Sequence, residues 1–255
     1  RELLQYQQEE DTPDALATVP MLQLSDIPDK ARFYALEEAG TGDIQLMHYP
    51  QFTNGLVYVS LYFQLRALPE ELIPYAALMP ALLGKLSTAA CSFGELDNEL
   101  NLHTGGFTSH LASYLENRCD ENIFPRLVIS SKARNSDTSK MLDLLTGIIL
   151  DSRFRDKERL RGILTRHHAQ IEANIRQNGM NYAITRAASR YSNRGMFNEL
   201  TAGVEYYRFL TDLTGNFELK ADMLVTKLEE VASVVFNKRN MIAQVTCSTE
   251  DLSSF

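Results

Sequence analysis

The stretch TNGLVYVSLYFQL at residues 53–65 is the clearest strand signal in the chain, because its side chains alternate in polarity. Successive side chains of a β-strand point to opposite faces of the sheet. One face collects Val57, Val59, Leu61 and Phe63, and the other collects Tyr58, Ser60, Tyr62 and Gln64. The pattern predicts a strand whose apolar face packs against helices.

A helix is expected directly after this strand, in LPEELIPYAALMPALLGKLST at residues 68–88. Pro69 is tolerated in a first turn, and the two glutamates after it are favoured at the positive end of the helix dipole. We therefore expect a helix from Pro69 to about Leu83, with Gly84 near its end. This helix contains no His or Cys and no acid beyond its first turn, so it offers no reactive side chain.

The next segments predict a capped helix and a pair of strands. SFGELDNELNL at residues 92–102 fits a capping box, in which Ser92 accepts from the amide of Glu95 and the Glu95 side chain reaches back. GFTSHLASYLEN (106–117) and IFPRLVISSKA (123–133) alternate like two strands joined by the polar turn RCDEN.

The rest of the chain is mainly helical. The expected helices lie at residues 137–150, 156–177, 181–193, 202–217 and 218–236, with the third ended by Gly195, and a final strand lies at 240–249. The first of these helices has an apolar stripe made of Met141, Leu144, Leu145 and Ile148. Short-loop strand pairs and segregated helices indicate an α+β fold, with one mainly antiparallel sheet covered by a layer of helices.

The first residues resemble the end of a helix that stops near Pro13, and residues 15–33 read as an extended lead-in. Both termini look cut, so we interpret the chain as an excised piece of a longer protein. Residues 1–24 would be the end of a helical linker with its lead-in, and residues 25–255 a single α+β domain.

Charge and composition restrict the partners. A formal net charge of −8 argues against a nucleic acid or an anionic membrane as partner, because phosphates are recognised by basic surfaces. No apolar run reaches the roughly 18 residues of a membrane span. The three cysteines are far apart and odd in number, which fits a reducing intracellular compartment, such as a bacterial cytoplasm or an organelle matrix.

The histidines offer no complete metal site. His168 and Glu172 lie one helical turn apart, but that face supplies no third ligand. A solvated polar face is therefore the expected setting of His167 and His168. His48, at a strand end, is expected to be structural.

A weaker candidate surrounds the pair Gly105-Gly106. His103 and His110 flank this turn, and a metal there would require a carboxylate such as Glu99 to converge with them. A free-standing metalloenzyme stays a distant alternative, since turn geometry explains the glycines better. The chain has no P-loop, GxSxG or HExxH motif, so its motifs alone describe a catalytically silent domain.

Six stretches together carry a family resemblance. They are YQQEEDTPDALATVPMLQLSDIP (6–28), HYPQFTNGLVYVSLYFQLRALPEELIPYAALMPALLGKLST (48–88), SFGELDNELNLHTGGF (92–107), NGMNYAITRAASRYS (178–192), AGVEYYRFLTDL (202–213) and NMIAQVTCSTED (240–251). In this order and spacing they resemble the pitrilysin/insulinase class of zinc metallopeptidases, in its presequence-protease branch. The resemblance covers nearly the whole chain and implies the noncatalytic first domain of the C-terminal half.

The family resemblance implies an enzyme of two halves, each with two homologous α+β domains, around a closed chamber for unfolded peptides. Zinc would belong to the parent's N-terminal domain, on an inverted H-x-x-E-H helix. When residues 84–88 are laid on the end of that helix, the motif window falls on Leu78-Met79-Pro80-Ala81-Leu82, which has no ligand. We expect no cofactor and no catalytic residue in this segment, whereas the parent would be a zinc metalloendopeptidase.

The segment would then wall the peptide chamber and help the two halves close. Its partners would be the other domains of its own parent chain and the unfolded peptide. We expect the strand at 106–115 to add the peptide by β-pairing, which makes the candidate substrate-facing residues Gly105, Gly106, Phe107, Thr108 and His110. A sheet that pairs both edges of this strand would contradict that expectation.

Two further expectations concern assembly. The alternative function is an inactive peptidase-like scaffold or assembly module with no protease partner. An H-x-x-E-H motif upstream in the full reading frame would favour the protease, and its absence would favour the scaffold. The isolated piece could also form a homodimer through apolar surface left by the missing halves.

Overall fold

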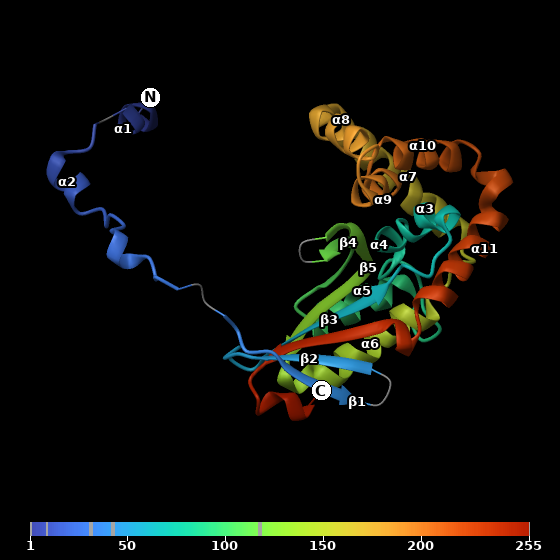
Figure 1. Cartoon of the computed structure of the whole chain (residues 1–255), viewed down its shortest axis with the longest axis horizontal. Coiled ribbons are helices and arrows are strands. Elements are labelled where there is room, and N and C mark those ends of the chain that lie inside the picture. The colour runs from blue at the N-terminus through green and yellow to red at the C-terminus, as the bar shows by residue number, and fades with distance from the viewer. Residues whose placement is uncertain (1, 9, 31–32, 42–43, 117–118, 255) are drawn as a thin grey trace. The chain divides into compact units, whose positions relative to one another are not determined.

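The computed structural model describes residues 2–8, 10–30, 33–41, 44–116 and 119–254. Its contacts divide the chain into two compact units, Arg1–Tyr34 and Ala35–Phe255. The second unit contains a sheet and its helices (Figure 1). The domain boundary expected at residue 24 stays a prediction.

The first unit contains helices α1 (Glu2–Gln8) and α2 (Pro13–Ala17) and a 3-10 turn at Leu24–Asp26. Helix α2 begins at its proline because the Thr12 hydroxyl accepts a hydrogen bond from the Ala15 amide at 3.3 Å. The extended lead-in expected at 15–33 is therefore wrong where α2 and the 3-10 turn form.

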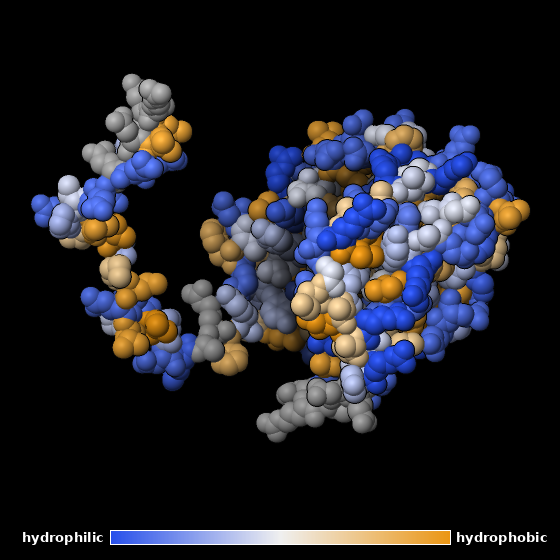
Figure 2. Space-filling model, turned by 90° about the horizontal axis from the view of Figure 1, so that it is seen from above, coloured by the Kyte–Doolittle hydropathy of each residue, from blue (hydrophilic) through white to orange (hydrophobic). Residues whose placement is uncertain are grey.

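None of the described side chains of the first unit is buried. Met21, Leu22 and Leu24 are 81%, 88% and 89% exposed, and Figure 2 shows hydrophobic side chains along the surface of this unit. Short helices without a buried apolar face are marginal in water. The first unit thus has no core of its own to hold its helices.

Within the described residues, six strands form one sheet in the order β1-β2-β6-β3-β5-β4. Their bounds are β1 (Glu37–Thr41), β2 (Ile44–Pro50), β3 (Leu56–Gln64), β4 (Phe107–Glu116), β5 (Cys119–Arg134) and β6 (Met241–Cys247). Strands β2 and β6 run parallel, and the other neighbouring pairs run antiparallel. The predicted mainly antiparallel sheet is confirmed. The turn expected at RCDEN falls partly outside the described residues, and β5 already begins within it.

Strand β3 lies inside the sheet, between β5 and β6. Its predicted alternation is confirmed, because Val57, Val59, Leu61 and Phe63 are all buried. Burying each such side chain stabilises the fold by roughly 1.5–3 kcal/mol. This face of the sheet is the one on which the helices pack.

The helices of the second unit are α3 (Ile73–Ala76), α4 (Met79–Leu82), α5 (Phe93–His103), α6 (Thr138–Asp151), α7 (Lys157–Gln177), α8 (Gly179–Ala188), α9 (Asn193–Ala202), α10 (Val204–Gly215) and α11 (Phe217–Val235). The capping box predicted at Ser92 and Glu95 and the buried stripe of α6 are both confirmed. Among the helices described, none has the length and apolar run that a membrane span requires.

The helix expected over residues 69–83 is broken, which corrects the prediction. The chain forms a 3-10 turn at Glu70–Leu72, then α3, then α4. Pro74 and Pro80 each lie in the first turn of one of these helices. A proline has no N–H, and its ring crowds the carbonyl four residues earlier, so each proline starts a new helix. Gly84 follows with a φ of +74°, as suits a residue just past a helix end.

Gly195 lies in the first turn of α9, so it does not end the third helix as expected. That helix, α8, already ends at Ala188, and the Ser192 hydroxyl accepts from the Gly195 amide at 3.0 Å to begin α9. A Cβ on Gly195 would lie 2.2 Å from the Ala188 carbonyl oxygen. Close packing of two helix ends, rather than helix termination, therefore requires this glycine.

Candidate functional site

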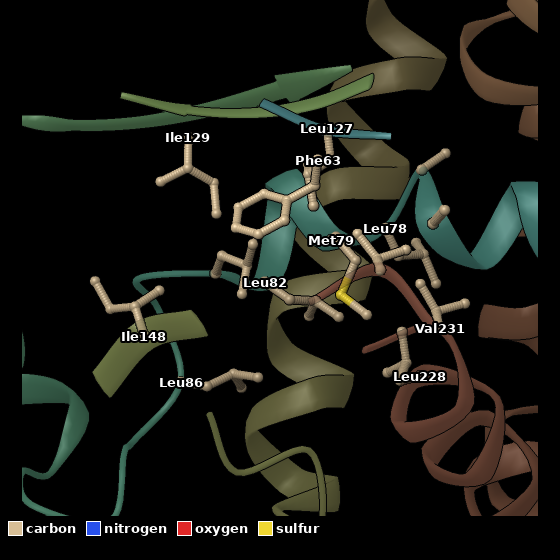
Figure 3. Close-up of a cluster of buried hydrophobic side chains, with 14 of the residues drawn as sticks. Phe63, Leu78, Met79, Leu82, Leu86, Leu127, Ile129, Ile148, Leu228 and Val231 are labelled. Atoms are coloured by element: carbon tan, nitrogen blue, oxygen red, sulfur yellow. The ribbon is translucent and has the colours of Figure 1, made fainter. Parts of the chain in front are cut away.

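Helix α4 contains most of the segment aligned with the zinc motif, and that segment faces the core. Leu78, Met79 and Leu82 are each 0% exposed, and Figure 3 shows them among side chains of the sheet and of α11. Pro80 and Ala81 line a surface cleft instead. None of these five side chains can ligate zinc, so the segment does not fit the metal.

No group of three His, Cys, Asp or Glu side chains in the described ranges is placed to hold a metal. His103 Nδ1 lies 3.3 Å from Asp137 Oδ1, and Glu99 Oε2 lies 2.7 Å from Lys140 Nζ. The hydrogen bond with His103 lowers the pKa of Asp137, and the one from Lys140 lowers the pKa of Glu99. Both carboxylates are thus occupied by protein partners, and His110 does not join them.

Strand β4 forms one edge of the sheet. It pairs with β5 from Phe107 opposite Ser131 to Leu115 opposite Ile123, and no described strand pairs with its other side. In an antiparallel pair only alternate residues direct N–H and C=O at the partner, so the remaining groups point outward. The condition that would contradict the predicted β-pairing is therefore not met.

This edge is also long. Strand β4 has 10 residues and contains neither a proline nor a lysine, which are devices that usually blunt a free edge. A row of outward N–H and C=O groups of this length can bind an extended peptide through its main chain.

The glycine pair before β4 serves the backbone. Gly105 donates its amide to the Lys132 carbonyl at 2.7 Å, and a Cβ there would lie 2.7 Å from the Lys132 side chain. Gly106 has a φ of +120°, a conformation that other residues rarely adopt. Its carbonyl accepts from the Ser131 hydroxyl at 2.9 Å. These contacts make a tight turn that sets the start of the edge strand.

The candidate side chains on β4 point to two faces. Phe107 packs against the core, whereas Thr108 and His110 are exposed on the opposite face. Ser109 lies on the same side as Phe107, and its hydroxyl donates to the Pro80 carbonyl at 3.2 Å. This hydrogen bond fastens the edge strand to α4, so the edge and the zinc-motif segment are neighbours.

His167 and His168 are half-buried against α10, which corrects the expected solvated face. His167 Nε2 lies 3.0 Å from the Tyr206 hydroxyl, which donates to the Ala77 carbonyl at 3.2 Å. His168 Nε2 lies 2.9 Å from the Thr211 hydroxyl. These partners come from a helix far along the chain, so helical periodicity alone does not reveal them.

A Cys–His–Glu arrangement lies at the opposite side of the sheet, and it is structural. His48 Nδ1 lies 3.0 Å from Glu37 Oε2, and its Nε2 lies 3.2 Å from the Cys247 carbonyl and 3.8 Å from the Cys247 sulfur. His48 and Cys247 are both 0% exposed, and burial raises the pKa of the Cys247 thiol. A nucleophile needs thiolate character and access, and this thiol has neither. The contacts instead join β1, β2 and β6, as the structural reading of His48 predicts.

Residues 1–213 match the family of segments described as associated with the M-type peptidases of family sixteen, subfamily C. The chain belongs to this peptidase-associated family. Membership confirms the resemblance seen in the sequence and leaves the site residues on β4 as predictions.

Two relatives show how much of a longer protein the chain represents. Protein HypA of Clostridium perfringens is 30% identical over 255 residues, which are 100% of this chain and 26% of that protein. Presequence protease 1, chloroplastic/mitochondrial, of Arabidopsis thaliana is 23% identical over 99% of this chain and 23% of its own length. The chain therefore spans about a quarter of the length of these relatives.

The fold has a solved counterpart. The crystal structure of a conserved protein from Enterococcus faecalis aligns with a TM-score of 0.60 at 15% identity, over 86% of this chain and 50% of that one. At this identity the likeness concerns the fold, and it agrees with the predicted α+β class.

Proposed function

We propose that this chain is a noncatalytic domain of a zinc-dependent metalloendopeptidase that degrades short unfolded peptides. The domain would wall the peptide chamber and support its closure. Zinc would be held by the N-terminal domain of the parent, because the residues of α4 do not fit a metal.

The observation that carries this proposal is the outer edge of β4, unpaired within the described sheet and fastened to α4. An unfolded peptide has free N–H and C=O groups, and an open sheet edge supplies matching partners whatever the peptide sequence. Such binding suits an enzyme that accepts many peptides. Gly105, Gly106, Thr108 and His110 would lie along the peptide, while Phe107 would mainly support the strand from the core side.

The exposed apolar side chains of the first unit support partnership with the rest of the parent chain. Leu22 and Leu24 are nearly fully exposed, and apolar groups gathered at this density usually face another surface. We propose that other domains of the parent cover them, which would link this domain to the closing of the two halves.

A complementation experiment tests the proposed function. The parent chain is expressed without these 255 residues, and this chain is added in trans while hydrolysis of an unfolded peptide is followed. We expect the truncated parent to be inactive and the added chain to restore hydrolysis. A truncated parent that is fully active alone, or a parent frame without H-x-x-E-H, would favour the scaffold alternative.

A further inference from the structure

A cleft of about 440 Å³ opens between α4 and α7, on the side of α4 that faces away from the core. It is lined by Ala77, Pro80, Ala81, Lys85, Ile163, Arg166, His167 and Gln170. One part of this lining is apolar and the other is polar. The polar part contains two permanent cations and no acid.

The cations of the cleft are not used within the protein. Lys85 and Arg166 are exposed, and neither forms an ion pair with a carboxylate among the residues that the structure describes. By contrast, Arg155 and Arg161, on and just before the same helix α7, pair with Glu229 and Glu218 at 2.9 and 2.6 Å. In a chain of net charge −8, two neighbouring cations without acids form a local site of opposite sign.

The histidine of the cleft is held in one orientation. The Tyr206 hydroxyl donates its only hydrogen to the Ala77 carbonyl, so it accepts the hydrogen bond from His167 Nε2–H. Burial, and then the charge of nearby Lys85, lower the pKa of His167. The imidazole is therefore neutral near pH 7, and Lys85 and Arg166 provide the positive charge.

We propose that this cleft binds the carboxylate of a peptide, with an apolar side chain of the same peptide against Ala81 and Ile163. Lys85 and Arg166 would pair with the carboxylate, because charge-assisted hydrogen bonds to carboxylates are among the strongest that proteins make. Gln170 would offer an amide donor. The carboxylate belongs to a C-terminus or to an Asp or Glu side chain.

The peptide as ligand rests on the proposed function, whereas the carboxylate rests on the cleft alone. The apolar part of the lining favours a ligand with an apolar group beside its anion over an inorganic anion. Two cations without an acid also repel a metal ion, so the site differs from a degenerate zinc site in the ligand it selects.

Calorimetric titration of the full chain tests this inference with three Gly/Ser peptides of equal length. The first ends in leucine with a free carboxylate, the second is its amide, and the third is an amide with an internal Glu-Leu pair. We expect the free acid to bind about tenfold more tightly than its amide. Binding of the third peptide as tightly as the first would assign the carboxylate to a side chain.

Two substitutions and a control identify the site. Lys85→Met and Arg166→Gln are exposed changes that should each remove most of the free-acid advantage. Arg239→Gln changes an exposed cation outside the cleft and should leave it intact. Equal affinity for all three peptides, or a free-acid advantage that survives both substitutions, would overturn the inference.

N-acetyl-leucine separates this inference from the proposed function, because it has the carboxylate and the apolar group but cannot pair along β4. Its competition by excess phosphate is measured alongside. Binding that depends on Lys85 supports the cleft even if complementation of the parent fails. No binding of N-acetyl-leucine, or its full displacement by equimolar phosphate, contradicts the cleft and leaves the β4 edge unaffected.

Discussion

Helix α4 and strand β4 are neighbours that use their residues in opposite ways. The segment from Leu78 to Leu82 gives Leu78, Met79 and Leu82 entirely to the core, where a catalytic relative would hold zinc. Strand β4 gives only one face to the core and leaves its outer edge unpaired. The Ser109–Pro80 hydrogen bond joins the two. The difference indicates that the domain keeps a peptide-binding edge while the position of the chemistry has become packing.

The largest effect should come from the core side of α4. Leu82→Ala removes a side chain that is 0% exposed, so we expect the free energy of unfolding to fall by about 2–5 kcal/mol in urea denaturation. Thr108→Ala on β4 is the matched control and should change it by no more than about 0.5 kcal/mol. Similar losses from both substitutions would end the contrast between the two elements.

A pair of proline substitutions sharpens the description of β4 as an edge. Successive amides of the strand point alternately at β5 and outward. Of Ser109→Pro and His110→Pro, one should therefore cost about 1–3 kcal/mol more than the other, because only one removes a ladder hydrogen bond. Thermal or urea unfolding of both variants measures the difference. Equal losses would mean that both sides of β4 are engaged.

Tyr206→Phe probes the cleft side of α4. The substitution removes the hydroxyl that joins His167 to the Ala77 carbonyl and leaves both without this partner. We expect a loss of about 1 kcal/mol in the free energy of unfolding. If stability is unchanged, the hydroxyl does not hold α4 against α7 and α10.

The same histidine predicts a pH dependence. Burial and Lys85 lower the pKa of His167 below its ordinary 6.5, so the folded chain binds fewer protons than the unfolded chain in that window. The contribution of His167 to stability is therefore present above pH 6.5 and is lost as the pH falls toward the folded pKa. His167→Gln should flatten this part of the stability curve. An unchanged slope would show that His167 titrates as it does in water.

The smallest effect should be that of zinc. The segment at α4 lacks ligands, and Glu99 and Asp137 are already bonded to Lys140 and His103. Equimolar zinc should leave the melting temperature unchanged, and His103→Ala should not alter this result. A stabilisation of several degrees that disappears in His103→Ala would revive the metalloenzyme alternative.

The sequence predicted the features that depend on neighbouring residues. The alternation of β3, the Ser92–Glu95 capping box and the buried stripe of α6 all follow from local spacing. The three-piece helix was missed because its apolar pattern continues through Pro74 and Pro80, although proline chemistry breaks it. Strand β1, EEAGT, lacks β-forming side chains and exists through its pairing with β2.

Features that depend on distant segments could not be predicted in the same way. The edge position of β4 follows from the order in which six strands pair, which local patterns do not specify. The His167–Tyr206–Ala77 contacts bring together three elements far apart in the chain. The role proposed for Thr108 and His110 came from a family resemblance and still depends on the binding of a peptide.

Amide hydrogen exchange on the full chain, with and without a saturating unfolded peptide, tests whether β4 is a peptide-binding edge. We predict that the outward amides between Phe107 and Leu115 exchange at least about tenfold more slowly with the peptide, while those of β3 are unchanged. A copy of the peptide with alternate N-methyl groups should give no protection. Unchanged exchange along β4, or equal protection by the methylated copy, would contradict the proposed function.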